Sequence, residues 1–149
     1  LKKIKISKIY TSNLLRAKET GKIISKMIKA PIKGALEELN EYKTKSLRER
    51  FRIMFLFNKR LRKLKQFLND ISKDKDKDKT ILIVAHGITN RIILGHLLKI
   101  PLKEQLLRFR QHNANFNILS WNKKCNSWNV NSINDISHLP IKLVLGKGY

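Results

Sequence analysis

The residues best placed for chemistry are His86 and Gly87, which follow a short apolar run in the middle of the chain. The run, Ile81 to Ala85, is rich in β-branched residues, which predicts a strand buried on both faces. Apolar residues then recur at helical spacing up to Pro101, where the helix ends. Ligands bind outside the carboxyl ends of such strands, where helix N-termini favour anions. This stretch alone is equally consistent with a turn histidine that has no role.

A second candidate is Arg16, in the first turn of another predicted helix. The alternating strand Ile4 to Thr11 precedes this helix, and Ser12 or Asn13 can cap it. A cation is unfavourable at the positive end of a helix dipole, but the two together suit an anion between them. Because Arg16 and His86 each follow a strand, a parallel sheet would bring both to one edge. An exposed arginine on a solvated face is the alternative.

An acidic cluster lies between these two candidates in the chain. Glu37, Glu38 and Glu41 fall within five positions, although the chain has only 11 acidic residues in total. Without further context, a solvated turn is the simpler explanation of this cluster.

The remaining elements complete an α/β pattern. A long basic amphipathic helix is predicted from Ser46 to Ile71, followed by a low-complexity loop from Asp74 to Lys79. A short helix or turn is predicted from Leu102 to Phe109. The segments Asn115 to Trp121 and Ser127 to Val130 predict two antiparallel strands. These elements predict an α/β fold.

The composition limits the partners that the chain can have. Its 33 Lys and Arg against 11 Asp and Glu give a net charge of +22, which favours anionic partners. Because Ile and Asn are also abundant throughout, we interpret the charge as a compositional bias and do not expect a nucleic-acid partner. Cys125 is the only cysteine, which excludes an internal disulfide and a Cys-based metal site. No apolar run approaches the ~20 residues of a membrane span, so we expect one soluble, cytoplasmic domain over residues 1–149.

Two stretches together resemble a known family. IYTSNLLRAKET, at Ile9 to Thr20, resembles the Ser-x-Leu-x-Arg-Ala-x-x-Thr motif of the histidine phosphatase superfamily, also called phosphoglycerate mutase-like. ILIVAHGITNRIIL, at Ile81 to Leu94, resembles the second-histidine motif of that family. LEEL, at Leu36 to Leu39, resembles the segment that carries the proton donor. QHNANFNILSW and NDISHL, near the C-terminus, are similar to the last strands. The resemblance implies a mostly parallel sheet flanked by helices.

The resemblance implies a role for each matching residue. Arg16 would clamp the phosphoryl group, because its planar fork can bond two oxygens. His86 would bond a phosphoryl oxygen and stabilise the charge that develops during transfer. Gly87 would let the backbone approach the phosphate. Glu38 would protonate the leaving alcohol, with Glu37 as the less favoured neighbour. No metal or other cofactor is implied, and the substrate would be a small phosphorylated compound.

One part of the family pattern has no counterpart here. The nucleophile of the family is the histidine of an Arg-His-Gly motif, which precedes the Ser-x-Leu-x-Arg motif. Only 11 residues precede Ser12 in this chain, and none of them is histidine. The other histidines, His96, His112 and His138, lie in different contexts. We therefore expect that the chain lacks its first strand and first helix and is inactive alone.

The function implied is a small phosphatase that acts through a phosphohistidine intermediate. Mutases of the family usually carry a long insertion between the acid and the second histidine, whereas Glu38 and His86 are only 48 positions apart (86 − 38). A phosphoglycerate mutase and a non-catalytic protein that binds phosphate or nucleic acid are the alternatives. The substrate and the oligomeric state do not follow from the sequence.

Overall fold

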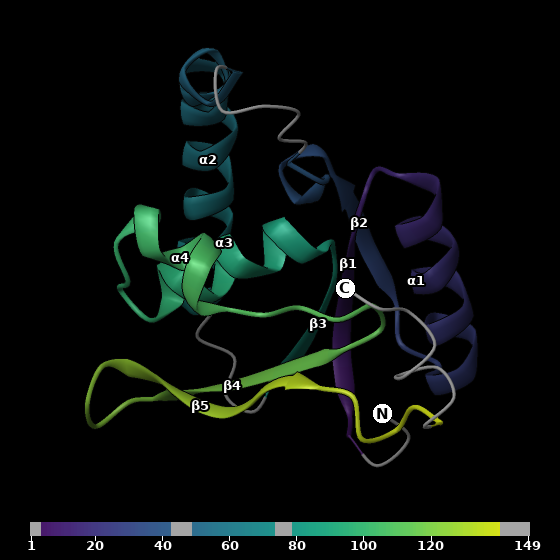
Figure 1. Cartoon of the computed structure of the whole chain (residues 1–149). Coiled ribbons are helices and arrows are strands. Elements are labelled where there is room, and N and C mark those ends of the chain that lie inside the picture. The colour runs from purple at the N-terminus through teal and green to yellow at the C-terminus, as the bar shows by residue number, and fades with distance from the viewer. Residues whose placement is uncertain (1–3, 43–48, 74–78, 141–149) are drawn as a thin grey trace. The chain divides into compact units, whose positions relative to one another are not determined.

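The computed structural model describes residues 4–42, 49–73 and 79–140 (Figure 1). The start of the predicted helix at Ser46 and nearly all of the predicted loop from Asp74 to Lys79 lie outside these residues. By its internal contacts the chain divides into two compact units, Leu1–Asn90 and Arg91–Tyr149. Each is described by itself below, and the single domain that the sequence predicts stays a prediction.

The first unit contains a parallel sheet of three strands. These are β1 (Ile6–Ser12), β2 (Ile32–Leu36) and β3 (Thr80–Val84), in the order β2-β1-β3. Both pairings of β1 are parallel, and Thr11 lies beside Val84 near the ends of β1 and β3. The carboxyl ends of these two strands therefore lie at the same edge. This confirms the α/β fold with a parallel sheet.

Helix α1 (Leu15–Ile28) covers one face of this sheet. Ile9, which is fully buried on β1, forms a core with Ile24 and Ile28 of the helix. The helix approaches closely at Gly21, where an added Cβ would lie 2.4 Å from Thr11 Cγ2. The predicted cap is wrong, because the N-cap residue is Leu14 and no side chain caps the helix.

Helix α2 (Glu49–Lys73) covers the opposite face of the sheet. Successive residues of a strand point to opposite sides, so Tyr10 points away from the face on which Ile9 lies. Tyr10, the neighbour of Ile9, packs edge-on against Phe67 of α2 with their ring centroids 5.0 Å apart. Three leucines of α2 at helical spacing are also buried: Leu61, Leu64 and Leu68. The short 3₁₀-helix η1 (Glu37–Leu39) connects β2 toward α2 and buries Leu39.

Strand β3 differs from the expectation of a strand buried on both faces. Within the described part of the chain it pairs only with β1, so it is an edge strand. Its apolar residues, Ile81 to Val84, are all half-buried. Exposed apolar edges favour added pairing partners.

The second unit contains most of helix α3 (Gly87–Leu97), which begins in the first unit, then α4 (Leu102–Arg108) and a hairpin. The hairpin strands, β4 (Phe116–Asn122) and β5 (Ser127–Asp135), are antiparallel as predicted, with Trp121 opposite Trp128. β5 extends beyond its predicted end at Val130. Among the described residues, none of the helices combines the length and apolar character needed to span a membrane.

Candidate active site

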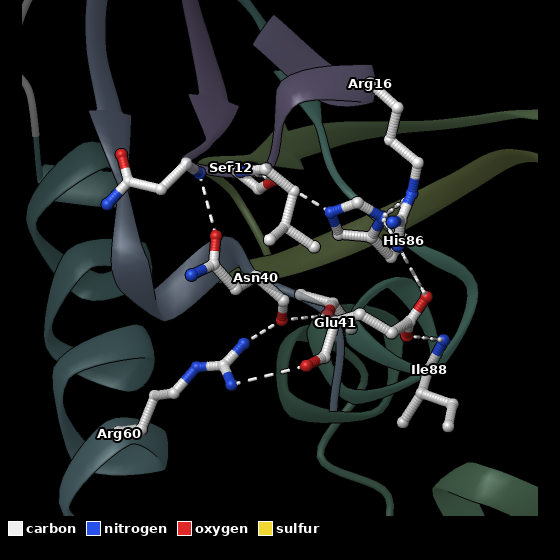
Figure 2. A network of polar contacts seen from close by, with 10 residues as sticks. Ser12, Arg16, Asn40, Glu41, Arg60, His86 and Ile88 are labelled. Carbon is white, nitrogen blue, oxygen red and sulfur yellow. Dashed lines mark hydrogen bonds and ion pairs between the residues drawn. The ribbon is translucent and has the colours of Figure 1, made fainter. Parts of the chain in front are cut away.

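The carboxyl ends of β1 and β3 bring Arg16 and His86 into contact, as the sequence predicted. Nε and Nη2 of Arg16 lie 3.2 Å and 2.9 Å from Nδ1 of His86 (Figure 2). Arg16 projects from the first turn of α1, and His86 lies between β3 and α3. Helix N-termini attract anions through their free amide groups and their dipole. The pair is therefore positioned for an anionic ligand.

The environment of His86 keeps its ring neutral. The residue is only 7% exposed. Burial, followed by the charges of Arg16 and Arg60, lowers the pKa of His86 to about 4. Because a guanidinium group only donates hydrogen bonds, Nδ1 must be an acceptor. The neutral ring therefore carries its proton on Nε2, which lies 2.7 Å from Ser12 Oγ.

Glu41 completes the charged cluster. Its Oε1 accepts a hydrogen bond of 3.2 Å from the backbone N–H of Ile88, in the first turn of α3. Its Oε2 lies 3.7 Å from Arg16 Nη2 and 3.8 Å from His86 Nδ1. A carboxylate thus occupies the position next to the helix N-terminus that an anionic ligand would use (Figure 2).

Three separate parts of the chain hold the segment that carries Glu41. The backbone N–H of Asn13, after β1, donates to Oδ1 of Asn40 at 2.8 Å. The carbonyl oxygen of Asn40 accepts from Thr89 Oγ1 at 2.8 Å and from Arg60 Nη2. Arg60 also donates to the carbonyl of Glu41 at 3.4 Å, so the turn before α1, helix α2 and helix α3 all help to fix this segment.

Glu38, the predicted proton donor, lies elsewhere. Within the described residues it makes no hydrogen bond or ion pair with Arg16 or His86. It lines a separate hollow, together with Lys8 of β1 and Lys63 of α2. The structure thus brings together two of the three predicted catalytic residues, Arg16 and His86, and Glu41 lies beside them.

Sequence reasoning missed the contributions of Ser12, Glu41 and Arg60. Glu41 was visible only as a member of an acidic cluster, and its distance of three positions from Glu38 puts it past the turn of η1. Ser12 was visible as a possible helix cap. Arg60 was one of many basic residues on a long helix, so nothing in its spacing distinguished it.

The arrangement suits recognition of an oxyanion. The Arg16 guanidinium, Nδ1 of His86 and the backbone N–H of Ile88 all lie within 4 Å of the Glu41 carboxylate oxygens. The Arg16 side chain is 63% exposed, which leaves it free to turn toward a ligand from solvent. Gly87, predicted to bind phosphate, begins α3 directly beside His86. Within the described ranges, no three His, Cys, Asp or Glu side chains are grouped to hold a metal ion.

Comparisons with known proteins agree with this geometry. Residues 41–136 match the model of the histidine phosphatase superfamily (branch 1). A phosphoglycerate mutase from Plasmodium falciparum is 30% identical, with a TM-score of 0.62, and the match covers 92% of this chain and 75% of that one. A search of curated proteins found no match.

Two further solved structures have the same fold. The alpha-ribazole phosphatase from Shigella flexneri is 15% identical with a TM-score of 0.68, covering 91% of this chain and 76% of that one. A phosphoserine phosphatase mutant from Entamoeba histolytica, in complex with phosphoserine, is 20% identical with a TM-score of 0.67, covering 93% and 77%. The matched family model spans well over half of the sequence, and the chain belongs to the histidine phosphatase superfamily, branch 1.

Proposed function

We propose that the protein is a phosphomonoester hydrolase in which Arg16 and His86 bind the phosphoryl group. The observation that carries the proposal is the contact between the Arg16 guanidinium and His86 Nδ1 beside the N-terminus of α3. Membership of the superfamily supports it, as do neighbours named as phosphatases. The substrate would be a small phosphorylated compound.

Each residue has a proposed role. Arg16 bonds two phosphoryl oxygens through its fork. His86 bonds a third oxygen, and the backbone at Gly87 and Ile88 supplies amide groups from the start of α3. Charge that develops on the phosphoryl oxygens would be stabilised by the Arg16 guanidinium and by these amide groups.

For the proton donor we propose Glu41 in place of Glu38. Its carboxyl group lies within 4 Å of both Arg16 and His86. Among the described residues, Glu38 forms no hydrogen bond or ion pair with either. A general acid must come within hydrogen-bond reach of the leaving oxygen. A phosphoryl group held by Arg16 and His86 would bring its ester oxygen near Glu41.

These residues do not supply a nucleophile for this reaction. None of the four histidines, His86, His96, His112 and His138, lies in an Arg-His-Gly motif. We therefore propose that the chain binds phosphate but does not turn over esters by itself. The expected result is saturable binding of phosphate and no release of nitrophenol from para-nitrophenyl phosphate. Turnover at a rate typical of an enzyme would show that the nucleophile lies within this sequence.

Phosphoglycerate mutase activity is the second candidate, because the mutase from Plasmodium falciparum is 30% identical. Only 45 positions separate Glu41 from His86 (86 − 41), which leaves little room for an insertion over the site. Competition for bound phosphate distinguishes the two. A mutase site should prefer 3-phosphoglycerate, with its carboxylate, over a neutral alkyl phosphate, whereas a small phosphatase site need not.

A binding protein without catalysis is the remaining alternative. If the gene encodes residues ahead of Leu1, the enzyme hypothesis predicts an Arg-His-Gly motif after an apolar strand there. A different sequence at that position would favour a binding role. A cytoplasmic location and the absence of a nucleic-acid partner stay predictions.

A further inference from the structure

The ring of His86 has a second partner that the proposed chemistry does not use. Ser12 is the last residue of β1 and is fully buried. Its Oγ lies 2.7 Å from Nε2 of His86, although 74 positions separate the two residues. Figure 2 shows Ser12 on the side of the ring away from Arg16. The imidazole is therefore held at both of its nitrogens.

The donors around the ring determine where its proton lies. Arg16 points two N–H groups toward Nδ1, so Nδ1 presents a lone pair. The single N–H of the neutral ring is then on Nε2, and it donates to Ser12 Oγ. The backbone N–H of Leu14 donates to the same oxygen at 3.2 Å. With the proton on Nε2, the Ser12 oxygen accepts from both the His86 ring and the Leu14 backbone.

We infer that Ser12 is a positioning residue, which holds His86 as the Nε2–H tautomer so that Nδ1 faces the anion site. A neutral Nδ1 cannot donate a hydrogen bond to a phosphoryl oxygen. When phosphate replaces Arg16 at this nitrogen, Nδ1 takes up one proton from solvent and donates it in a hydrogen bond to phosphate. Nε2–H stays on Ser12 throughout, so the ring does not have to turn. This second step depends on the proposed phosphate site.

The charges around His86 explain why the proton arrives with the ligand. Two cations act on the ring, Arg16 from α1 and Arg60 from α2, and they disfavour a charged imidazole. Glu41, after η1, is the one carboxylate whose contact with Nδ1 is described, and its Oε2 lies 3.8 Å away. A phosphate dianion offsets the two cations, which makes protonation of Nδ1 favourable.

The first test needs no ligand. The ¹⁵N resonances of the His86 ring, recorded on the full chain near pH 7, identify which nitrogen carries the proton, and loss of the signals in His86→Gln assigns them. The wild-type chain should contain the Nε2–H tautomer. Ser12→Ala removes the acceptor of Nε2–H, so the Nδ1–H tautomer should gain population although the Arg16 donors still oppose it. Ser12→Thr should restore the original tautomer because it keeps the hydroxyl. Ser25→Ala is the matched control, since it removes a hydroxyl that bonds the carbonyl of Ala30 at 2.6 Å in the same unit.

The second test measures the coupling to phosphate. Calorimetric titration with inorganic phosphate in two buffers of different ionisation enthalpy gives the number of protons taken up. We expect uptake of about one proton in excess of that due to phosphate itself, and affinity about tenfold lower in Ser12→Ala. Ser25→Ala should change neither quantity.

The outcomes separate the two proposals. An Nδ1–H tautomer in the wild-type chain, or an unchanged tautomer in folded Ser12→Ala, overturns the role of Ser12 whatever the phosphate result. The wild-type spectrum gives this answer even if Ser12→Ala does not fold. A tautomer that depends on Ser12 in a chain that binds no phosphate supports positioning by Ser12 but overturns the proposed function. Phosphate binding without proton uptake overturns the coupled protonation alone.

Discussion

Two networks of polar contacts, one in each unit of the chain, can be compared. The His86 network joins Ser12, Arg16, Glu41 and His86 in the first unit. The Asn134 network joins side chains of the second unit: Gln111, His112, Asn115, Asn117 and Asn134. Both connect residues that are distant in the sequence. They differ in whether a ligand could form stronger hydrogen bonds with their members than the existing partners do.

The Asn134 network consists mainly of amide groups that bond one another. Oδ1 of Asn134 accepts from the backbone N–H of His112 at 2.7 Å and from Asn115 Nδ2 at 3.1 Å. Asn117 donates to Gln111 at 2.8 Å, and its own oxygen accepts from the backbone of Asn134 at 2.9 Å. These bonds attach the segment before β4 to β5. The members of this network are hydrogen-bonded mainly to one another, and the network stabilises the fold locally.

The His86 network instead combines like and unlike charges around a neutral ring. Arg16 is mostly exposed and uses His86 as an acceptor, although a carboxylate lies 3.7 Å from it. A phosphate can give Arg16 stronger, charge-assisted bonds than a neutral imidazole can. The number of hydrogen bonds therefore does not distinguish a binding site from a structural network. The presence of a charge that a ligand can bond better does.

The largest expected effect is the loss of phosphate affinity when the His86 network is broken. Arg16→Lys keeps the charge but loses the planar fork, and His86→Ala removes the second contact. Charge-assisted hydrogen bonds contribute ~1.5–3 kcal/mol each, so the dissociation constant should rise roughly tenfold to a hundredfold in either variant. Calorimetric titration with inorganic phosphate measures this change.

Matched controls come from the second unit. Arg108→Lys changes an exposed arginine that pairs with Glu104, and His138→Ala removes a histidine that packs against Phe116. Neither should change phosphate affinity. Equal losses in Arg16→Lys and Arg108→Lys would mean that phosphate binds through general charge and not through the fork.

The Asn134 network should show the opposite behaviour. Asn134 has a positive φ of 56°, which glycine also tolerates, so Asn134→Gly removes the side-chain bonds without backbone strain. The free energy of unfolding should fall by about 1–3 kcal/mol, because half-buried partners of Asn134 lose their hydrogen bonds. Chemical denaturation measures this change, with Asn131→Gly on the exposed part of β5 as the control. A loss of phosphate affinity in folded Asn134→Gly would remove the distinction between the networks.

A pH-dependent loss of stability should be traced to His86. Its folded pKa of about 4 lies below the ordinary value of 6.5, so the unfolded chain binds more protons between these values. The free energy of unfolding should therefore fall as the pH decreases from 6.5 toward 4, by at most ~1.4 kcal/mol per pH unit from one group. Denaturation curves of wild type and His86→Gln at several pH values isolate this contribution. Parallel curves would contradict a neutral, buried His86.

The smallest expected effect distinguishes the two candidate acids. Glu41→Gln removes a negative charge beside the anion site, and like charges 4 Å apart in water repel by about 1 kcal/mol. Phosphate affinity should therefore rise roughly fivefold, whereas Glu38→Gln should leave it unchanged. Titrations of the two variants side by side measure the difference. An increase in Glu38→Gln alone would return the role to Glu38.

The sequence predicted the elements and one contact of the site well. Strand patterns followed by helical spacing located β1, β3, α1 and α3, and parallel pairing then required Arg16 and His86 to meet at one edge. The position of Glu41 beside Arg16 and His86, on which we base its proposed role, did not follow from the sequence. This position depends on how η1 turns and on hydrogen bonds from Asn13, Arg60 and Thr89 to one short segment. Such contacts join distant parts of the chain and leave no periodic pattern.

The burial of β3 also did not follow from its sequence. An apolar run of β-branched residues predicts a strand buried on both faces, but burial depends on what the rest of the chain packs against the strand. Similarly, Ser12 is of a residue type that often caps helices. Its contact with His86 arises only because the folded chain places that residue beside the end of β1. Both features depend on how the strands and loops are arranged in the folded chain, which the local sequence does not determine.

A titration of the ¹⁵N-labelled chain with inorganic phosphate, followed by NMR, tests most directly whether the ends of β1 and β3 form a phosphate site. We expect saturable shifts that are largest for the Arg16 Nε–H, the His86 ring and the amides of Gly87 and Ile88. These four signals should give one dissociation constant. Shifts concentrated instead on the basic residues of α2, without a change at Arg16 and His86, would contradict the claim that the ends of β1 and β3 form a phosphate site.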